Sequence, residues 1–162
     1  MEVEMKIRGL VMDPMTNMPI VLLKDAASDT VLPIWVGIYE ANAIALEIEK
    51  VSTPRPMTHD LLKNLLIGLE STVRKVVVTE LRDDTFFAVI WIERDGQIIS
   101  IDSRPSDALA LALRMDCPIY VEEDVLKNSK QATSAVSERV SSDELRKWLE
   151  NLGEDDLGQY KM

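Results

Sequence analysis

Short apolar runs separated by polar turns dominate residues 1–121. Runs of strand length that end at turn residues such as Asp-Pro and Asp-Gly predict β-strands, at residues 4–12, 20–23, 30–36, 73–81, 85–93, 96–101 and 118–121. Apolar residues at helical spacing predict helices, at residues 38–51, 58–68 and 108–113. The chain therefore mixes strands and helices along its length.

The order of these elements is similar in two parts of the chain. Three strands followed by a helix occupy residues 4–51, and the same order recurs over residues 73–116. A repeat of this kind packs two sheet-and-helix halves together. We predict an α+β fold, a mixed β-sheet with helices that arose by internal duplication of a three-strand-plus-helix unit. Pro33 cannot donate a backbone hydrogen bond, which predicts an edge or a bulge in its strand.

The pattern changes after residue 126. Residues 127–140 are polar and poorly patterned, which is typical of a connector. Residues 141–144 fit a capping box, and the apolar residues that follow share one helical face, namely Leu145, Trp148, Leu149 and Leu152. We divide the chain into a domain over residues 1–126 and a polar connector with a C-terminal helix over residues 127–162. We expect that helix to dock on the body of the protein.

Two segments bring the same chemistry to the start of a helix. Residues 54–60 and residues 104–107 each place Arg-Pro before a hydroxyl side chain and an aspartate. Thr58 is the expected N-cap of the first helix, and Asp107 lies where the helix dipole favours a negative charge. Such a helix start can hold an anion or a metal, or it can simply be a capped helix beside a salt bridge.

Three motifs in the same order resemble the bifunctional nuclease domain family. They are Leu-Pro-Ile-Trp-Val-Gly at residues 32–37 followed by Glu40-Ala41, Arg-Pro-Met-Thr-His-Asp-Leu at residues 55–61, and Ile-Asp-Ser-Arg-Pro-Ser-Asp-Ala at residues 101–108. The resemblance covers residues 4–125. It implies a metal-dependent nuclease that acts on DNA and RNA without strong sequence preference, so nucleic acid is the expected partner.

The charge and the histidine and cysteine content restrict that function. A net charge of −10 is unfavourable for a passive nucleic-acid binder, because such proteins rely on Lys and Arg. A nuclease of this charge must meet its substrate through a local basic patch or bound metal ions. His59 is the only histidine and Cys117 the only cysteine, which leaves no ordinary structural zinc site. Oxygen ligands favour magnesium, manganese or calcium, and we predict Mg²⁺ or Mn²⁺.

The chain shows no sign of a membrane or secretory segment. Residues 1–6 lack the basic start and apolar stretch of a signal peptide, and no uncharged apolar run approaches the ~20 residues of a membrane span. A single cysteine agrees with a reducing compartment. We therefore expect a cytoplasmic protein without a membrane partner.

If the two Arg-Pro segments lie side by side, their side chains form one hydrolytic centre. We then expect four catalytic residues: His59, Asp60, Asp107 and Arg104. His59 is the expected general acid or base. The expected substrate-binding residues are Arg55, Arg104, Ser106 and Thr58. The expected metal ligands are Asp60, Asp102, Asp107 and Glu40.

Two other functions fit the same residues. The arginines and helix starts can hold a small phosphate or carboxylate ligand, such as a nucleotide, without cleaving it. Alternatively, the ion pairs only lock the loops, and the chain is a structural or regulatory homodimer. Because the apolar strands exceed what three helices can cover, we expect a homodimer or higher homo-oligomer.

Overall fold

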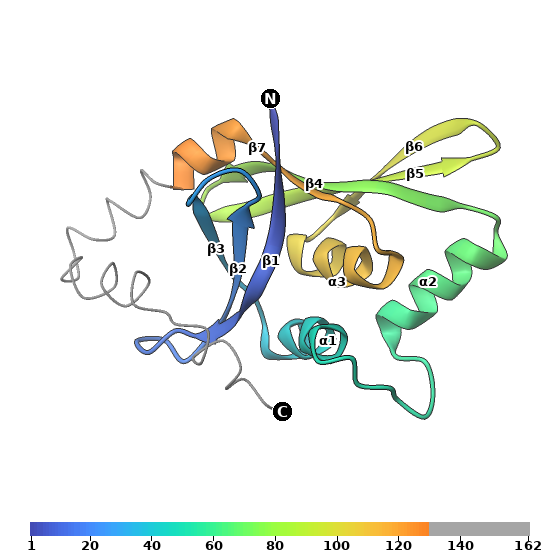
Figure 1. Cartoon of the computed structure of the whole chain (residues 1–162), viewed down its shortest axis with the longest axis horizontal. Helices are drawn as coiled ribbons and strands as arrows, with labels where there is room; N and C mark the ends of the chain where they lie inside the picture. Colours follow the sequence, from blue (N-terminus) through green and yellow to red (C-terminus); the bar gives the residue numbers. More distant parts are fainter. Residues whose placement is uncertain (130–162) are drawn as a thin grey trace.

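The computed structural model describes residues 1–129 and shows one sheet with helices gathered beside it (Figure 1). Its strands are β1 Glu2–Met12, β2 Pro19–Asp25, β3 Val31–Trp35, β4 Thr72–Arg82, β5 Thr85–Arg94, β6 Gln97–Ser103 and β7 Ile119–Glu122. Its helices are α1 Ile38–Ile48, α2 Thr58–Gly68 and α3 Pro105–Met115. Residues 123–129 add a further helical segment. The predicted helix at residues 141–152 lies outside the described residues.

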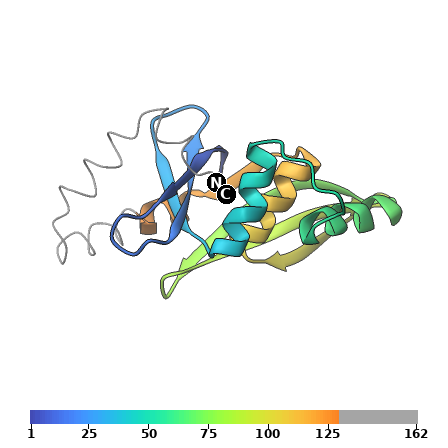
Figure 2. The ribbon, with the colours of Figure 1, turned by 90° about the horizontal axis from the view of Figure 1, so that it is seen from below.

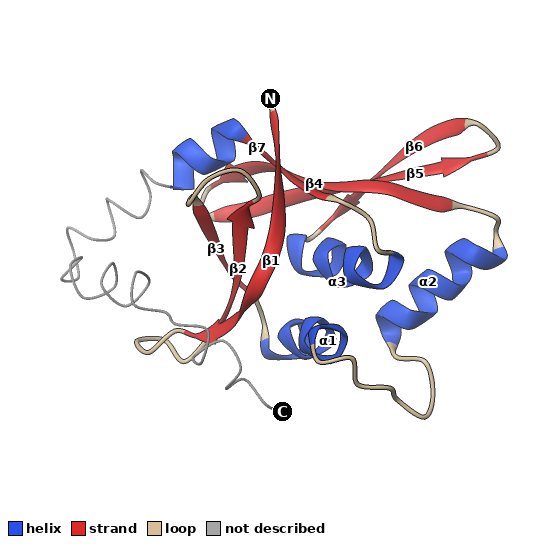
Figure 3. Cartoon of the chain, viewed as in Figure 1, coloured by secondary structure: helices blue, strands red, loops and turns tan. Residues whose placement is uncertain are grey.

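The seven strands form a single mixed sheet in the order β3-β2-β1-β7-β4-β5-β6. Neighbouring strands are antiparallel except for β4 and β7, which are parallel. The α+β class with a mixed sheet is thereby confirmed (Figure 3). Pro33 lies on β3 at one edge of the sheet, as expected for a residue that cannot donate a ladder hydrogen bond. The two halves repeat the order of three strands and a helix, but the duplication itself stays a prediction.

Helix α3 is the centre of the helical layer. It contacts β4 and β5 of the sheet, while α1 and α2 both contact α3 (Figures 1 and 2). Most of its apolar residues are buried, among them Ala108, Leu109, Ala110, Leu111 and Ala112. Pro105 opens the helix at a position where its missing N–H removes no hydrogen bond. The helix ends at Asp116, which adopts a left-handed conformation with φ 52°.

A buried arginine ties the three helices together. The side chain of Arg114, on α3, is only 2% exposed. Its Nε donates a hydrogen bond to Asp60 Oδ1 on α2 at 2.8 Å, and its Nη2 donates to the carbonyl oxygen of Ala43 on α1 at 2.9 Å. Its Nη1 donates to the carbonyl oxygen of Ala110 at 2.8 Å. One guanidinium therefore fixes α1 and α2 relative to α3.

Asp60 also caps its own helix. Its Oδ2 accepts a hydrogen bond from the backbone N–H of Met57 at 2.9 Å. The prediction that Thr58 is the N-cap is wrong, because Met57 is the N-cap residue and Thr58 is the first residue of the helix. The carboxylate three residues after Met57 satisfies a free backbone donor, as the second half of a capping box does. Asp60 thus joins the start of α2 to the buried arginine.

Within residues 1–129, no helix combines the length and apolar character needed to cross a membrane.

Replacing Arg114 with Met should lower the free energy of unfolding by about 3 kcal/mol. The change removes the guanidinium and leaves the Asp60 carboxylate and the carbonyl oxygens of Ala43 and Ala110 without their donor. Urea unfolding followed by circular dichroism measures this change. Arg94→Met is the matched control, since Arg94 is exposed at the β5–β6 turn and surface ion pairs contribute little. A loss no larger than that of the control would show that Arg114 does not hold the helices together.

Candidate functional site

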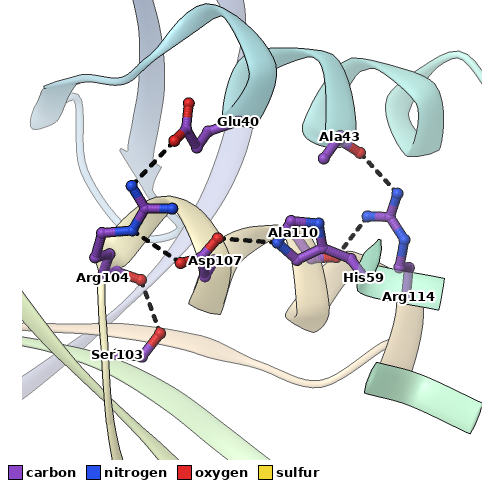
Figure 4. A network of polar contacts seen from close by, with 8 residues as sticks. All are labelled: Glu40, Ala43, His59, Ser103, Arg104, Asp107, Ala110 and Arg114. Atoms are coloured by element: carbon purple, nitrogen blue, oxygen red, sulfur yellow. Dashed lines mark hydrogen bonds and ion pairs between the residues drawn. The ribbon is translucent and has the colours of Figure 1, made fainter. Parts of the chain in front are cut away.

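Four charged or titratable side chains form a continuous row where α1, α2 and α3 begin (Figure 4). His59 Nε2 lies 3.0 Å from Asp107 Oδ1. Arg104 Nε donates to Asp107 Oδ2 at 2.9 Å, and Arg104 Nη1 donates to Glu40 Oε1 at 3.0 Å. We call these residues the His59–Glu40 row. It brings together residues that are 48 and 64 positions apart in the sequence.

Local geometry places Arg104 and Asp107 for this contact. Arg104 is the N-cap of α3, with an extended backbone at φ −71° and ψ 145°. Pro105 enforces this extended form, since a residue that precedes proline is excluded from helical conformations by steric contact. Asp107 follows three residues later in the first turn, where the helix dipole favours its charge. The Arg-Pro-x-Asp spacing therefore brings the two side chains of this ion pair together within one turn of the helix.

Gly37 makes room for the other end of the row. It is the N-cap of α1, and Glu40 lies in the first turn of that helix. A Cβ atom at position 37 would collide with the carboxylate of Glu40. An alanine there would push the Glu40 carboxylate away from its present place beside Arg104.

The row holds Asp107 in its ionised form. Burial raises the pKa of Asp107, but hydrogen bonds from Arg104 and His59 outweigh burial and lower that pKa below its ordinary value. The hydrogen bond to Asp107, followed by the one to Glu40, raises the pKa of the Arg104 guanidinium. Since Asp107 is ionised and can only accept, His59 Nε2 carries the proton and donates it.

Exposure increases along the row from His59 to Arg104. The His59 side chain is 11% exposed, Asp107 is 31% exposed and Arg104 is 64% exposed. The bonds described for Arg104 use two of the five N–H donors of a guanidinium, and this group faces solvent. Arg104 can therefore bind an anion from solution, whereas His59 is nearly buried.

An apolar groove of about 610 Å³ runs from this row between α2 and the β5–β6 hairpin. We call it the α2 groove. Leucines of α2 form one wall, and aromatic and branched side chains of β5 and β6 form the other. Its lining residues include Leu62, Leu65, Leu66, Leu69, Phe86, Ile90, Ile92 and Ile101. Asp102, Ser103, Arg104 and Asp107 line its polar end.

The structure separates Arg55 and Asp60 from the row. Both line a second pocket of about 320 Å³, next to Arg114. The backbone N–H of Met57, then the Arg114 side chain, overcome burial and lower the pKa of Asp60, which serves the helix cap and the helix junction. The two Arg-Pro segments thus meet through the neighbouring pair His59 and Asp107, while Arg55 and Arg104 line different pockets.

The remaining predicted residues differ in accessibility. Asp102 is exposed on β6 opposite Val89 and lines the α2 groove. Thr58 is exposed at the start of α2, and Ser106 is buried in the first turn of α3. Of the expected substrate-binding groups, Arg104 therefore combines exposure with a place in the row.

The expected metal ligands do not form one cluster. In the described part of the chain, no three His, Cys, Asp or Glu side chains gather closely enough to hold a metal ion. Glu40 and Asp107 approach the same point, but both accept hydrogen bonds from Arg104. Asp60 is bound to Arg114 instead. A cation at this site would therefore find two carboxylates, Glu40 and Asp107, that already bind Arg104.

Arg114 and Gly37 were not identified from the sequence. Arg114 carried a signal, because it is a charge within the apolar run of α3, and such a charge is buried only when it is paired. Gly37 is the last residue of the Leu-Pro-Ile-Trp-Val-Gly motif, but the motif does not show that a Cβ atom there would meet the Glu40 carboxylate, since that depends on where Glu40 turns.

Replacing Asp107 with Asn should destabilise the protein at neutral pH by about 1–2 kcal/mol, the amount expected for charged hydrogen bonds that are partly exposed. The folded pKa of Asp107 is lowered, so its stabilisation is present above the unfolded value near 3.9 and is lost as the pH falls through the folded pKa. The difference between wild type and variant should therefore shrink below about pH 4.

Urea titrations between neutral and acidic pH measure this difference. Asp84→Asn is the control, because Asp84 is exposed in a turn whose left-handed conformation Asn tolerates. A difference between wild type and Asp107→Asn that stays constant with pH would contradict an ionised, hydrogen-bonded Asp107.

Comparison with known proteins agrees with the motifs at this site. The pattern of the bifunctional nuclease domain matches residues 21–134. An uncharacterized protein of Mycobacterium tuberculosis is 38% identical over 163 residues, which cover 95% of this chain and 97% of that protein. Bifunctional nuclease 1 of Oryza sativa is 29% identical over 68% of this chain and 34% of its own length, and bifunctional nuclease 1 of Arabidopsis thaliana is 29% identical over 64% of this chain and 33% of its length. The chain belongs to the bifunctional nuclease domain family.

Proposed function

We propose that this protein hydrolyses phosphodiester bonds of DNA and RNA at the His59–Glu40 row. The observation that carries the proposal is the open guanidinium of Arg104 beside the ionised Asp107, in a chain whose family and plant relatives are named for nuclease activity. Phosphodiester hydrolysis requires a cation that binds the phosphoryl oxygens and a group that orients the attacking water. The row supplies both.

Arg104 is the proposed phosphate-binding residue. Its raised pKa keeps it charged, and its exposed fork can donate two parallel hydrogen bonds to phosphoryl oxygens. Glu40 and Asp107 hold the fork from behind, so little ordering is needed when the substrate arrives. This contact gives an acidic protein one local point of attraction for a polyanion.

Asp107 is the proposed residue that orients the attacking water. Its carboxylate is fixed by Arg104 on one oxygen and by His59 on the other. A carboxylate with a lowered pKa is a weak base alone. His59 lies 3.0 Å away and donates its Nε2–H to this carboxylate, so Asp107 itself accepts the proton of the water while His59 keeps the carboxylate oriented. Because His59 is nearly buried, we assign it a positioning role behind Asp107.

A divalent ion, Mg²⁺ or Mn²⁺, is part of the proposal. Magnesium sites often use one or two protein carboxylates and complete their coordination with substrate phosphates and water. Glu40 and Asp107 are the two carboxylates suited to this. The ion would neutralise charge that develops on the phosphoryl oxygens.

The cytoplasm is the proposed location. The single cysteine, Cys117, is the basis for proposing a reducing compartment. Burial raises the pKa of its thiol to about 11, so Cys117 is poorly suited to nucleophilic chemistry.

Arg104→Met and Asp107→Asn should each lower cleavage of labelled single-stranded DNA and RNA by roughly 100-fold or more, the usual effect of removing an electrostatic or acid-base group. Arg55→Met should leave cleavage near the wild-type rate, because Arg55 lines the other pocket. Reactions with Mg²⁺, with Mn²⁺ and with EDTA test the metal. Circular dichroism confirms that each variant is folded.

Cleavage that persists in both Arg104→Met and Asp107→Asn would contradict the site and indicate a contaminating nuclease. Cleavage lost in Arg55→Met but not in Arg104→Met would place the site in the other pocket. Unchanged cleavage in EDTA would contradict the proposed metal dependence but not the proposed site.

A non-catalytic binding role is the second candidate, and one observation favours it. Each side chain of the row already bonds another member of the row, and the described residues contain no buried side-chain polar atom without a partner. A row that is held in this way can bind a nucleotide phosphate at the free donors of Arg104 without reacting. Thermal stabilisation by nucleotides, lost in Arg104→Met and accompanied by no cleavage in wild type, would support this candidate.

A further inference from the structure

The helix α2 is covered on one side only. Its only buried residue in the described structure is His59, although the helix is rich in leucine. Leu62 and Leu65 of the helix, and Leu69 directly after it, line the α2 groove. They are exposed together with two isoleucines of β6. The members of this surface, the α2–β6 face, are Leu62, Leu65, Leu69, Ile99 and Ile101.

Ile99 belongs to this face by its register. It pairs with Ile92 in the β5–β6 ladder, and Ile101 pairs with Ile90. Residues directly opposite each other in such a ladder point to the same side of the sheet. Ile90, Ile92 and Ile101 line the α2 groove, so Ile99 lies on the same side and extends that apolar surface to the edge of the sheet.

The two edges of the sheet differ in their protection. β3, at one edge, has five residues and contains Pro33. β6, at the other edge, has seven residues, of which six are exposed, and it contains no proline or lysine. Soluble proteins usually protect edge strands with prolines, lysines or bulges, because free backbone N–H and C=O groups pair with another strand. The β6 edge lacks these protections.

We propose that the α2–β6 face binds a second copy of this chain, with β6 pairing antiparallel to β6 of the second copy. A twofold axis makes the same surface meet itself. Pairing centred on Ser100 sets Ile99 of each copy opposite Ile101 of the other, which extends the apolar surface across the junction. The two sheets then join into one, and the leucine faces of the two α2 helices lie over the shared groove.

The size of the surface fits this partner. The five side chains of the α2–β6 face are each between 39% and 53% exposed. A homodimer interface is roughly 65% apolar, and a standard interface buries about 800 Å² on each partner. The α2–β6 face therefore supplies the apolar centre of such an interface, and neighbouring side chains supply the rest.

The charge distribution also favours this face. Two copies of a chain with net charge −10 repel each other, so they associate most readily where few charges meet. Among the residues of β6, only Asp102 is charged. The charges that line the α2 groove, Asp102, Arg104 and Asp107, lie together at its polar end.

Light scattering coupled to size exclusion tests the proposal on the full chain. Wild type at micromolar concentration should have twice the mass of the 18.3 kDa chain, whereas Ile99→Lys and Leu65→Lys should have the mass of one chain. Lysine at an edge strand is a natural block to pairing. Ile67→Lys is the matched control and should remain dimeric, because Ile67 is exposed on the same helix but does not line the groove.

Three outcomes would overturn the proposal. A wild-type mass of 18.3 kDa across the micromolar range excludes the dimer. A dimer that survives both Ile99→Lys and Leu65→Lys places the interface elsewhere. A monomer whose β6 amides are protected from hydrogen exchange only when single-stranded oligonucleotide is added assigns the face to nucleic acid. Circular dichroism verifies that the lysine variants keep their secondary structure.

Discussion

The contact between Arg114 and Asp60 is the constraint on which the helical layer depends. A guanidinium buried in α3 costs free energy unless its donors are satisfied, and here the partners come from all three helices. Asp60 meets Arg114 and caps α2 at once, so the start of α2 has one favourable position on α3. That position carries His59 to Asp107. The chemistry of the row therefore depends on an ion pair that takes no part in it.

The two Arg-Pro motifs have similar sequences but different roles. One contributes to the His59–Glu40 row, and the other contributes Asp60 to the contact with Arg114. Both motifs place an arginine and a proline before a helix and an aspartate inside it. In the second motif, Arg104 and Asp107 bind each other and stay accessible to solvent. In the first motif, Asp60 turns to the buried arginine and Arg55 lines the neighbouring pocket. Similar sequence thus becomes an open ion pair in one place and a structural lock in the other.

The acidic character of the chain determines how such a site meets a polyanion. Most of the surface repels nucleic acid at a net charge of −10, so attraction is confined to the place where a cation is exposed and preorganised. Arg104 is held by two carboxylates that also attract divalent ions. Such a site favours a short contact with a single phosphate over a long electrostatic track.

The sequence determined the elements whose causes are local. The pattern of the strands and of α3, the edge position of Pro33 and the Arg104–Asp107 pair follow from periodicity, from proline geometry and from a spacing of three residues. The sequence also carried three family motifs. Only the tertiary structure decided that His59 meets Asp107 across 48 positions, that Asp60 meets Arg114 across 54, and that Arg55 stays apart from Arg104. These partners depend on how α2 lies across α3, and that placement results from burying a charge that no local pattern can pair.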